Sequence, residues 1–226
     1  MPQIALHHVS KNYSLGDQSI QAVNKASLMI EKGDFISIVG HSGSGKTTLL
    51  SLIGGITGPS SGTIFFEEKE IFSLGSDLLS EYRCEKVGFM FQFASLLPML
   101  TVRENVLLPT AFSAKKSPSG GAGQKAAELL GMVGLADKIE AYPSQLSGGQ
   151  QRRVAIARAF MNSPAVVLAD EPTGDLDEET EKDMMDFFRT MNRTQGVTFI
   201  MVTHNTDLAK QTARRIRMHQ GSIQEQ

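Results

Sequence analysis

The sequence has 226 residues, a hydrophobic fraction of 41% and a charged fraction of 20%, which are typical of a globular protein with a sizeable buried core. Its formal net charge of -2 argues against a general nucleic-acid binder, because such proteins carry a basic excess. The single cysteine, Cys84, excludes an internal disulfide and favours a reducing compartment such as the cytosol.

The chain shows no membrane-spanning pattern. The first residues, MPQIALHHVSKNYS, lack the apolar core of a signal peptide. No apolar run approaches the ~20 residues that a spanning helix needs. The most apolar stretches, 87–100 and 197–202, are interrupted by polar residues or proline, or are too short. We therefore expect a chain that does not cross a membrane by itself, which leaves open that it binds a protein that does.

In the first part of the chain, short β-type runs alternate with helical patterns, which predicts an α/β fold. The first two strands are expected to form an antiparallel ribbon. We predict strands at 4–9, 20–30, 35–39, 63–66 and 87–91, and helices at 46–53 and 77–84.

Strand signals stop at about residue 94 and return at 165. Within this stretch Thr101 and Glu104 form a capping box, and Ser147 can cap a second helix that continues to Asn162. Residues 113–123 are rich in Ser, Gly and Lys and are expected to form a mobile loop. We predict further helices at 124–133, 178–193 and 206–211, and strands at 165–169, 197–203 and near Ile216.

These elements predict a single domain, residues 1–226, without internal repeats. Its α/β core has a mainly parallel sheet flanked by helices, with the antiparallel ribbon at its N-terminus. The core would comprise residues 1–93 and 165–226, and residues 94–164 would form an inserted α-helical arm.

The sequence GHSGSGKT at 40–47 fits the phosphate-binding pattern G-x-x-x-x-G-K-[ST] at every fixed position. A buried strand precedes it and a helix follows, as such a loop requires. Consecutive backbone N–H groups would bind phosphate oxygens, Lys46 would reach the β- and γ-phosphates, and the Thr47 hydroxyl would ligate Mg²⁺. The alternative is a glycine-rich turn that binds nothing. The predicted nucleotide-binding residues here are Gly40, His41, Ser42, Gly43, Ser44, Gly45, Lys46, Thr47 and Thr48.

Two carboxylates, Asp170 and Glu171, follow an apolar strand. We expect Asp170 to hold Mg²⁺ through water, and Glu171 to act as the general base that polarises an attacking water. Alternatively, Glu171 is a solvated residue before the turn at Pro172.

Three other side chains have two interpretations each. Gln92 ends an apolar strand and is either a satisfied loop amide or a ligand of the metal and water. His204 also ends a strand, where it is either structural or in contact with a γ-phosphate. Tyr13 in the N-terminal ribbon either packs or stacks on adenine, a contact of ~1–3 kcal/mol for base–aromatic pairs.

The motif LSGGQ at 146–150 places Ser147, Gly148, Gly149 and Gln150 at a predicted helix N-terminus, which is suited to bind a second anion. The motif does not reveal whether this anion belongs to the chain's own nucleotide or to a neighbour's.

Taken in order, these motifs and Asp175–Leu176–Asp177 resemble the ATP-binding subunit of an ABC transporter over essentially the whole chain. The resemblance implies ATP and Mg²⁺ as cofactors and an adenine-stacking role for Tyr13. It further implies that Gln92 is the glutamine of the Q-loop, Glu171 the catalytic base and His204 the switch histidine. Two subunits would pair head-to-tail and bury two ATP molecules, with the LSGGQ motif acting on the neighbour's nucleotide.

Within this family, FMFQ at 89–92, LLP at 96–98, TVRENV at 101–106 and ADEPTG at 169–174 are most similar to ATPases of lipoprotein-release, macrolide-export and cell-division complexes. The resemblance implies membrane permease subunits as partners and a cytoplasmic location, peripheral on the inner membrane through the permease. Two features differ from this branch: Asp175 stands where Asn is common, and residues 113–123 are unusually rich in Gly and Ser.

The apolar segment 93–100 either docks a partner or packs on the core. We interpret the basic residues Arg152, Arg153, Arg214, Arg215 and Arg217 as solvated faces. Alternative functions are a soluble ABC-type ATPase of DNA repair or translation, and a non-transport regulatory ATPase such as that of a cell-division complex. The chain lacks the long coiled-coil insertion of the DNA-repair ATPases, the second ATPase half of the translation ATPases and any basic excess. A non-enzymatic nucleotide sensor is disfavoured because Glu171 and His204 are both present, and a kinase or GTPase has no role for LSGGQ.

Overall fold

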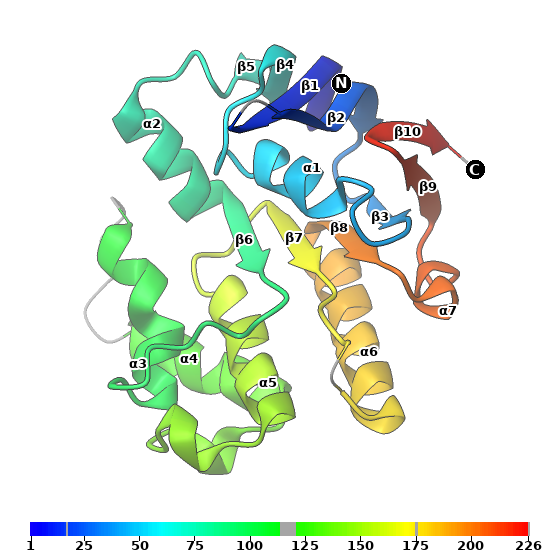
Figure 1. The fold of residues 1–226 in the computed structure, drawn as a ribbon. Helices are drawn as coiled ribbons and strands as arrows, with labels where there is room; N and C mark the ends of the chain where they lie inside the picture. Colours follow the sequence, from blue (N-terminus) through cyan, green and yellow to red (C-terminus); the bar gives the residue numbers. More distant parts are fainter. Residues whose placement is uncertain (17, 114–120, 175, 226) are drawn as a thin grey trace.

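The computed structural model describes residues 1–16, 18–113, 121–174 and 176–225. Its larger sheet has six strands in the order β10-β9-β3-β8-β7-β6 (Figure 1). All neighbouring pairs in it are parallel except β9 and β10. The strands are β3 (Phe35–Val39), β6 (Val87–Met90), β7 (Val166–Asp170), β8 (Thr198–Thr203), β9 (Arg214–His219) and β10 (Ser222–Glu225).

The strands at the centre of this sheet are apolar over nearly their whole length because both of their faces are covered. Every residue of β7 and β8 is buried. The register pairs Val39 with Thr203, and Asp170 with Val202, so β3, β7 and β8 end at the same edge of the sheet. Residues that directly follow these strands are therefore brought close together.

The N-terminal residues form a second, antiparallel sheet in the order β2-β1-β4-β5. Helix α1 (Lys46–Ile53) lies between the two sheets (Figure 1) and buries four apolar side chains in a cluster to which both sheets contribute. The strands of this sheet are β1 (Ile4–Leu15), β2 (Gln18–Ile30), β4 (Ser61–Phe66) and β5 (Lys69–Glu70).

Between β6 and β7 the described chain is helical, and its helices gather beyond the end of β6 (Figure 1). Their apolar faces share a buried cluster with the larger sheet and with α6. The helices of this arm are α3 (Val102–Leu107), a 3-10 helix (Leu108–Phe112), α4 (Gly121–Met132), short 3-10 turns at Ala136–Lys138 and Pro143–Gln145, and α5 (Gly148–Ala159). The remaining helices are α2 (Ser76–Glu81), a π-helical turn (Tyr82–Lys86), α6 (Glu178–Gln195) and α7 (Thr206–Ala209).

The predicted fold class is confirmed, but several boundaries are wrong. Helix α5 ends at Ala159 rather than at Asn162, because Pro164 excludes the helical conformation from the residue before it and Ser163 has a φ of 52°. Gly121–Gly123 belong to α4 rather than to a loop, since Ala122 packs on the arm's apolar cluster. The rest of the predicted mobile loop, 114–120, and Asp175 lie outside the described residues.

Two short strands, β5 and β10, were not predicted from the sequence. β5 has two residues and β10 has four, which is too short for a period of two to stand out. Both are held by hydrogen bonds to a preceding strand, β4 and β9 respectively, so they form hairpins that only pairing reveals.

Asn105 on α3 fixes the segment that leads from β6 into the arm. Its side chain is fully buried, and its amide nitrogen lies 3.0–3.1 Å from the carbonyl oxygens of Leu97, Leu100 and Thr101. Its amide oxygen accepts a hydrogen bond of 2.8 Å from the Leu97 N–H. One side chain therefore holds four backbone groups of the segment 97–101.

We predict that Asn105→Ala lowers the free energy of unfolding by about 2–3 kcal/mol, because four partly buried backbone groups lose their hydrogen bonds to this side chain. Urea denaturation checks this. Gln124→Ala, an exposed amide on α4, is the matched control and should change the free energy by less than about 0.5 kcal/mol. Equal effects of the two substitutions would contradict the assignment.

Candidate active site

Glycines shape the loop between β3 and α1. Gly45 has a φ of 102°, and a Cβ atom on it would lie 2.1 Å from the Ala22 carbonyl oxygen. A Cβ atom on Gly40 would lie 2.3 Å from the Met218 carbonyl oxygen. Gly45 caps α1 without a side-chain hydrogen bond, so the first N–H groups of that helix are left for a ligand.

Two side chains of this loop are positioned to bind an anion. The Lys46 ammonium donates to the carbonyl oxygens of Gly40 at 2.8 Å and His41 at 3.0 Å, which holds its charge over the loop. The Ser44 hydroxyl is one of three buried side-chain N or O atoms in the described chain without a hydrogen-bond partner. An entering phosphate oxygen could accept its proton. The loop is therefore suited to bind phosphate.

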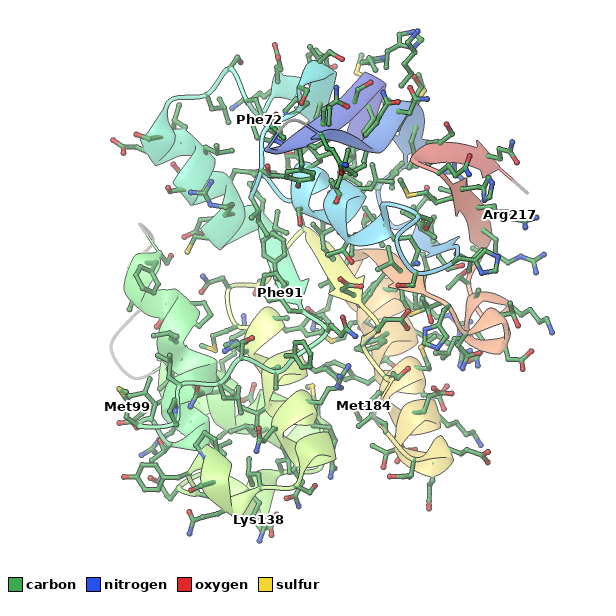
Figure 2. The ribbon with its side chains drawn as sticks, viewed as in Figure 1. Phe72, Phe91, Met99, Lys138, Met184 and Arg217 are labelled. Atoms are coloured by element: carbon green, nitrogen blue, oxygen red, sulfur yellow. The ribbon has the colours of Figure 1, made fainter. Side chains whose placement is uncertain are left out.

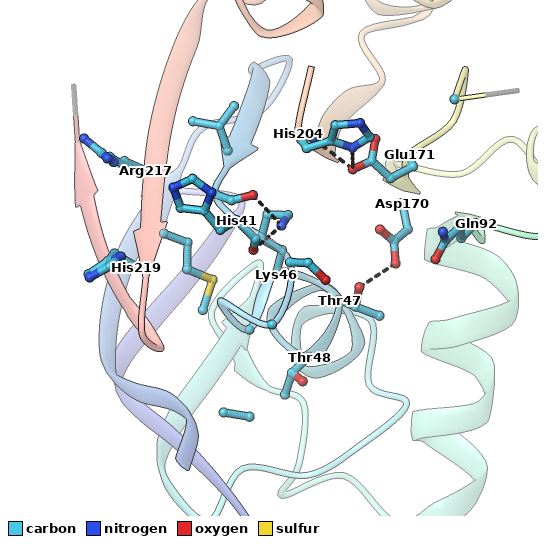
Figure 3. A pocket seen from close by; sticks show the side chains of 18 of the residues that line it. His41, Lys46, Thr47, Thr48, Gln92, Asp170, Glu171, His204, Arg217 and His219 are labelled. Atoms are coloured by element: carbon cyan, nitrogen blue, oxygen red, sulfur yellow. Dashed lines mark hydrogen bonds and ion pairs between the residues drawn. The ribbon is translucent and has the colours of Figure 1, made fainter. Parts of the chain in front are cut away.

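A cleft of about 1020 Å³ opens beside this loop (Figure 3). It is large enough for a nucleotide, because small-molecule sites usually occupy a few hundred to a thousand Å³. Polar residues from the ends of four strands of the larger sheet contribute to its walls. The lining residues are Ile20–Ala22, Val39–Gly43, Gly45–Thr48, Gln92, Arg152, Asp170, Glu171, Gly174, His204, Thr206 and Arg217–His219.

Asp170 ends β7 and faces α1. Its Oδ2 accepts a hydrogen bond of 2.7 Å from the Thr47 hydroxyl (Figure 3). Burial raises the pKa of the Asp170 carboxyl above its ordinary value and the neighbouring Glu171 carboxylate adds to this, whereas the Thr47 hydrogen bond and the Lys46 charge act in the opposite direction. A bound cation would favour the charged carboxylate in the same way as Lys46.

Thr47 and Asp170 fit Mg²⁺, which takes oxygen ligands and usually binds through one or two carboxylates together with substrate phosphates and waters. No cluster of three or more His, Cys, Asp or Glu side chains suited to a metal occurs in the described part of the chain. The side chains alone therefore make an incomplete metal site, which phosphate oxygens would complete.

Glu171 is held by the end of β8. One carboxylate oxygen accepts hydrogen bonds from the His204 backbone N–H at 2.9 Å and pairs with His204 Nδ1 at 2.7 Å, and the other accepts from the Thr203 hydroxyl at 3.0 Å. Its side chain is 16% exposed, and its φ is 48°, a left-handed conformation that costs about 1–3 kcal/mol in a non-glycine residue. The arrangement fixes a carboxylate in the cleft.

Gln92 follows β6 and lines the cleft, and Figure 3 shows its side chain on the same side as Asp170. Residues predicted from three separate strand ends, Gln92, Asp170–Glu171 and His204, thus share one cleft with the loop at 40–48.

Tyr13 does not line the cleft. It is 42% exposed, with the Lys11 ammonium 5.1 Å from its ring centroid. Its cross-strand partner Ile20 does line the cleft, so the tyrosine lies next to its edge.

The LSGGQ motif lies elsewhere. Ser147 caps α5 by accepting a 3.3 Å hydrogen bond from the Gln150 N–H, and the Gln150 side chain accepts one of 2.9 Å from the Ser147 N–H. Of the described residues that line the cleft, none belongs to Leu146–Gln150. The folded chain therefore does not bring this helix N-terminus to its own phosphate loop.

Arg152 is the residue that the sequence prediction placed wrongly. We expected a solvated side chain, whereas Arg152 is 6% exposed and lines the cleft. Helix α5 is covered on most of its surface by the arm and the core, which leaves its long side chains little access to solvent. The available signal was the helical spacing of Arg152 with Ile156 and Ala159, which places the arginine on a buried face. Of the other arginines interpreted as solvated, two are exposed (Arg215 and Arg217) and two are partly buried (Arg153 and Arg214). The cleft is also lined by Arg217 and His219, which were not predicted as site residues.

The family model for the ABC transporter matches residues 23–174. A lipoprotein-releasing system ATP-binding protein, LolD of Myxococcus xanthus, is 40% identical over 225 residues and matches along 100% of both chains. A macrolide export ATP-binding/permease protein, MacB of Syntrophobacter fumaroxidans, is 39% identical over 99% of this chain, which spans 31% of that protein.

Among solved structures, the chain is similar to the ATP-binding cassette MJ0796, a dimer in a post-hydrolysis state bound to ADP and phosphate. The TM-score is 0.94, the identity is 39%, and the match covers 99% of this chain and 97% of that one. In the described residues no helix is long and apolar enough to cross a membrane. The chain belongs to the ABC transporter family, as one of its ATP-binding cassettes with ATPase activity.

Proposed function

We propose that this chain is the energy-supplying subunit of a membrane complex, at the cytoplasmic face of the inner membrane, in which ATP binding closes two copies head-to-tail and hydrolysis reopens them. The observation that carries the proposal is the separation of two phosphate-binding devices. The loop at 40–48 lies in the cleft with Asp170 and Glu171, whereas the cap of α5 lies outside that cleft in the same chain. A second copy would supply the missing half of each site.

The loop would bind the triphosphate through backbone N–H groups, the Ser44 hydroxyl and Lys46, with Tyr13 stacking on the adenine. Thr47 and Asp170, with Gln92 at the rim, would hold Mg²⁺. That ion would neutralise charge on the β- and γ-phosphate oxygens.

Hydrolysis requires a water that attacks the γ-phosphorus while the bond to the β-phosphate oxygen breaks and ADP leaves. Glu171 would accept the proton of this water, because its carboxylate lies in the cleft and is oriented by Thr203 and His204. His204 is 76% exposed in its side chain, which leaves it free to turn toward a γ-phosphate when nucleotide is bound.

We propose residues 94–164 as a helical subdomain that carries the LSGGQ helix and docks the membrane permease. The apolar segment 93–100, where this subdomain begins, exposes several of its side chains: Phe93 and Met99 are each 74% exposed and Leu97 is 39% exposed. Figure 2 shows Met99 at the outer side of the arm. Leu96 instead packs on the arm's cluster, so the segment is anchored on one side and presents the other.

The transported molecule would be a lipoprotein, an amphiphilic drug or a peptide, because the relatives act in lipoprotein release and macrolide export. Its identity would be set by the permease. A permease with four spans and a large extracytoplasmic domain, encoded beside this chain, would support this class of complex, whereas a six-span importer-like permease would contradict it.

Replacing Glu171 tests the general base. Glu171→Gln should retain ATP binding, lower turnover by about 100-fold or more because a general base contributes that much, and accumulate an ATP-bound dimer. Phosphate release and size-exclusion chromatography with ATP measure these effects. Glu128→Gln, an exposed carboxyl on α4, serves as control and should hydrolyse normally. Undiminished hydrolysis by Glu171→Gln would remove Glu171 from this role.

Mixing two inactive variants tests the head-to-tail arrangement. Lys46→Ala breaks a protomer's own phosphate loop, and Ser147→Arg breaks the cap that it offers to a neighbour. A dimer with one copy of each keeps one intact composite site, so an equal mixture should recover about a quarter of wild-type hydrolysis in a two-fold dimer. If the cap serves its own nucleotide, the mixture should remain as inactive as each variant alone.

The docking surface has its own test. Leu97→Asp should abolish co-purification with the permease encoded beside this chain and abolish the stimulation of ATPase activity by it, because a charge would be buried in the interface. Basal hydrolysis by the isolated subunit should persist. Met29→Asp, on the far antiparallel sheet and 56% exposed, should leave both properties intact. Normal assembly of the Leu97→Asp variant would place docking elsewhere.

A further inference from the structure

Arg152 joins the arm to the core at Gln92 and Glu171, two residues that line the cleft. It lies on the first turns of α5, shortly after the Ser147 cap. One guanidinium nitrogen donates to the carbonyl oxygen of Glu171 and the other to that of Gln92, each at 2.5 Å. These carbonyls follow β7 and β6, so one side chain of the arm holds two separate strand ends of the core.

The burial of Arg152 strengthens the bridge that its two hydrogen bonds form between the Glu171 and Gln92 carbonyls. The residue is 6% exposed, and a buried charge is tolerated only when its N–H groups are paired. A guanidinium is rigid and planar with its donors in a fixed fork, so it sets the distance between the two carbonyl oxygens as well as their direction. A lysine ammonium has no such fork.

The bridge acts on the part of Glu171 that the core leaves least constrained. Two parts of Glu171 are fixed by the core. Its N–H donates a hydrogen bond of 3.0 Å to the Val202 carbonyl oxygen, and its carboxylate accepts hydrogen bonds from Thr203 and His204. The direction of its carbonyl depends on ψ, in a residue whose φ of 48° is already unfavourable. Within the described part of the chain, that carbonyl accepts hydrogen bonds from the Gly174 N–H at 3.2 Å and from Arg152.

We propose that Arg152 is a positioning residue for hydrolysis: through the carbonyls of Glu171 and Gln92 it sets the proposed base and the Q-loop glutamine relative to the LSGGQ helix. A movement of α5 that accompanies pairing with a second copy is thereby transmitted to the geometry of water attack. The role concerns the rate of hydrolysis and not the affinity for ATP. The inference rests on the proposed function of Glu171.

Two other arginines on α5 differ from Arg152 in the carbonyl groups that they hold. Arg158 donates to the carbonyl oxygens of Ser95 at 2.9 Å and Ala94 at 2.8 Å, so it ties α5 to the segment after Gln92 but not to Glu171. Arg153 donates to the Val133 carbonyl oxygen at 3.1 Å, a contact within the arm. Arg153 therefore provides a matched control for removing an arginine from this helix.

The test compares Arg152→Gln, Arg152→Lys and Arg153→Gln in the full chain. We expect both Arg152 variants to lose between about 10- and 100-fold in kcat, because misplacing a catalytic group by about 1 Å has effects of that size. Their KM for ATP, and the Kd of a non-hydrolysed fluorescent ATP analogue, should stay within about twofold of wild type. Arg153→Gln should keep all three values within the same limit. Thermal denaturation identifies any variant that does not fold, and Arg152→Lys, which keeps the charge and most of the stem, decides the question if Arg152→Gln is unstable.

Two results would overturn the proposal. A kcat within about twofold of wild type in a folded Arg152 variant would show that the bridge does not position the reacting groups. A loss of ATP-analogue affinity that matches the loss of kcat would mean that Arg152 acts as a direct phosphate ligand in the cleft. Glu171→Gln is assayed alongside: if it hydrolyses normally the proposed base is wrong, whereas an inactive Glu171→Gln with normal Arg152 variants refutes the positioning role alone.

Discussion

The parallel register of the larger sheet is the constraint on which the site depends. Because β3, β7 and β8 are paired in parallel, Val39, Asp170 and Thr203 lie at one edge of the sheet. The phosphate loop, the two carboxylates and His204 therefore lie at adjacent strand ends. The carboxyl edge of such a sheet is where ligands bind in open α/β folds. An antiparallel arrangement of the same strands would send these residues to opposite edges.

Burial and strain are concentrated at this edge of the sheet. Asp170 is desolvated, Ser44 carries an unpaired hydroxyl, and Glu171 adopts a left-handed backbone conformation. Each feature costs free energy by itself, and a bound phosphate and cation would offset that cost. These features suit the proposed binding of a nucleotide and a cation at this edge.

The arm connects this edge to the rest of the proposed machine. Its helix α5 presents the Ser147 cap at its N-terminus, and its Arg152 and Arg158 hold the chain that leaves β6 and β7. The exposed apolar segment that includes Leu97 continues directly from Gln92. Three binding events would therefore act on one set of hydrogen-bonded residues, Gln92, Arg152 and Glu171. These events are the binding of a partner on that segment, of a nucleotide in the cleft and of a second copy at the cap.

The sequence by itself determined the parts of the protein whose signals are local. Fixed glycine, lysine and threonine positions predicted the phosphate loop, because its geometry depends on residues within one turn, and Ser147 predicted the cap of α5. Alternation of strands and helices gave the α/β class, and apolar runs located the buried strands. Relations between distant segments were decided only by the tertiary structure: the contacts of Arg152 with the Gln92 and Glu171 carbonyls, the anchoring of Leu97 by Asn105, and the pairing of β10 with β9. The helical spacing of Arg152 with Ile156 and Ala159 indicates a buried face, but it does not reveal which groups the guanidinium contacts, because these belong to two strand ends far away along the chain.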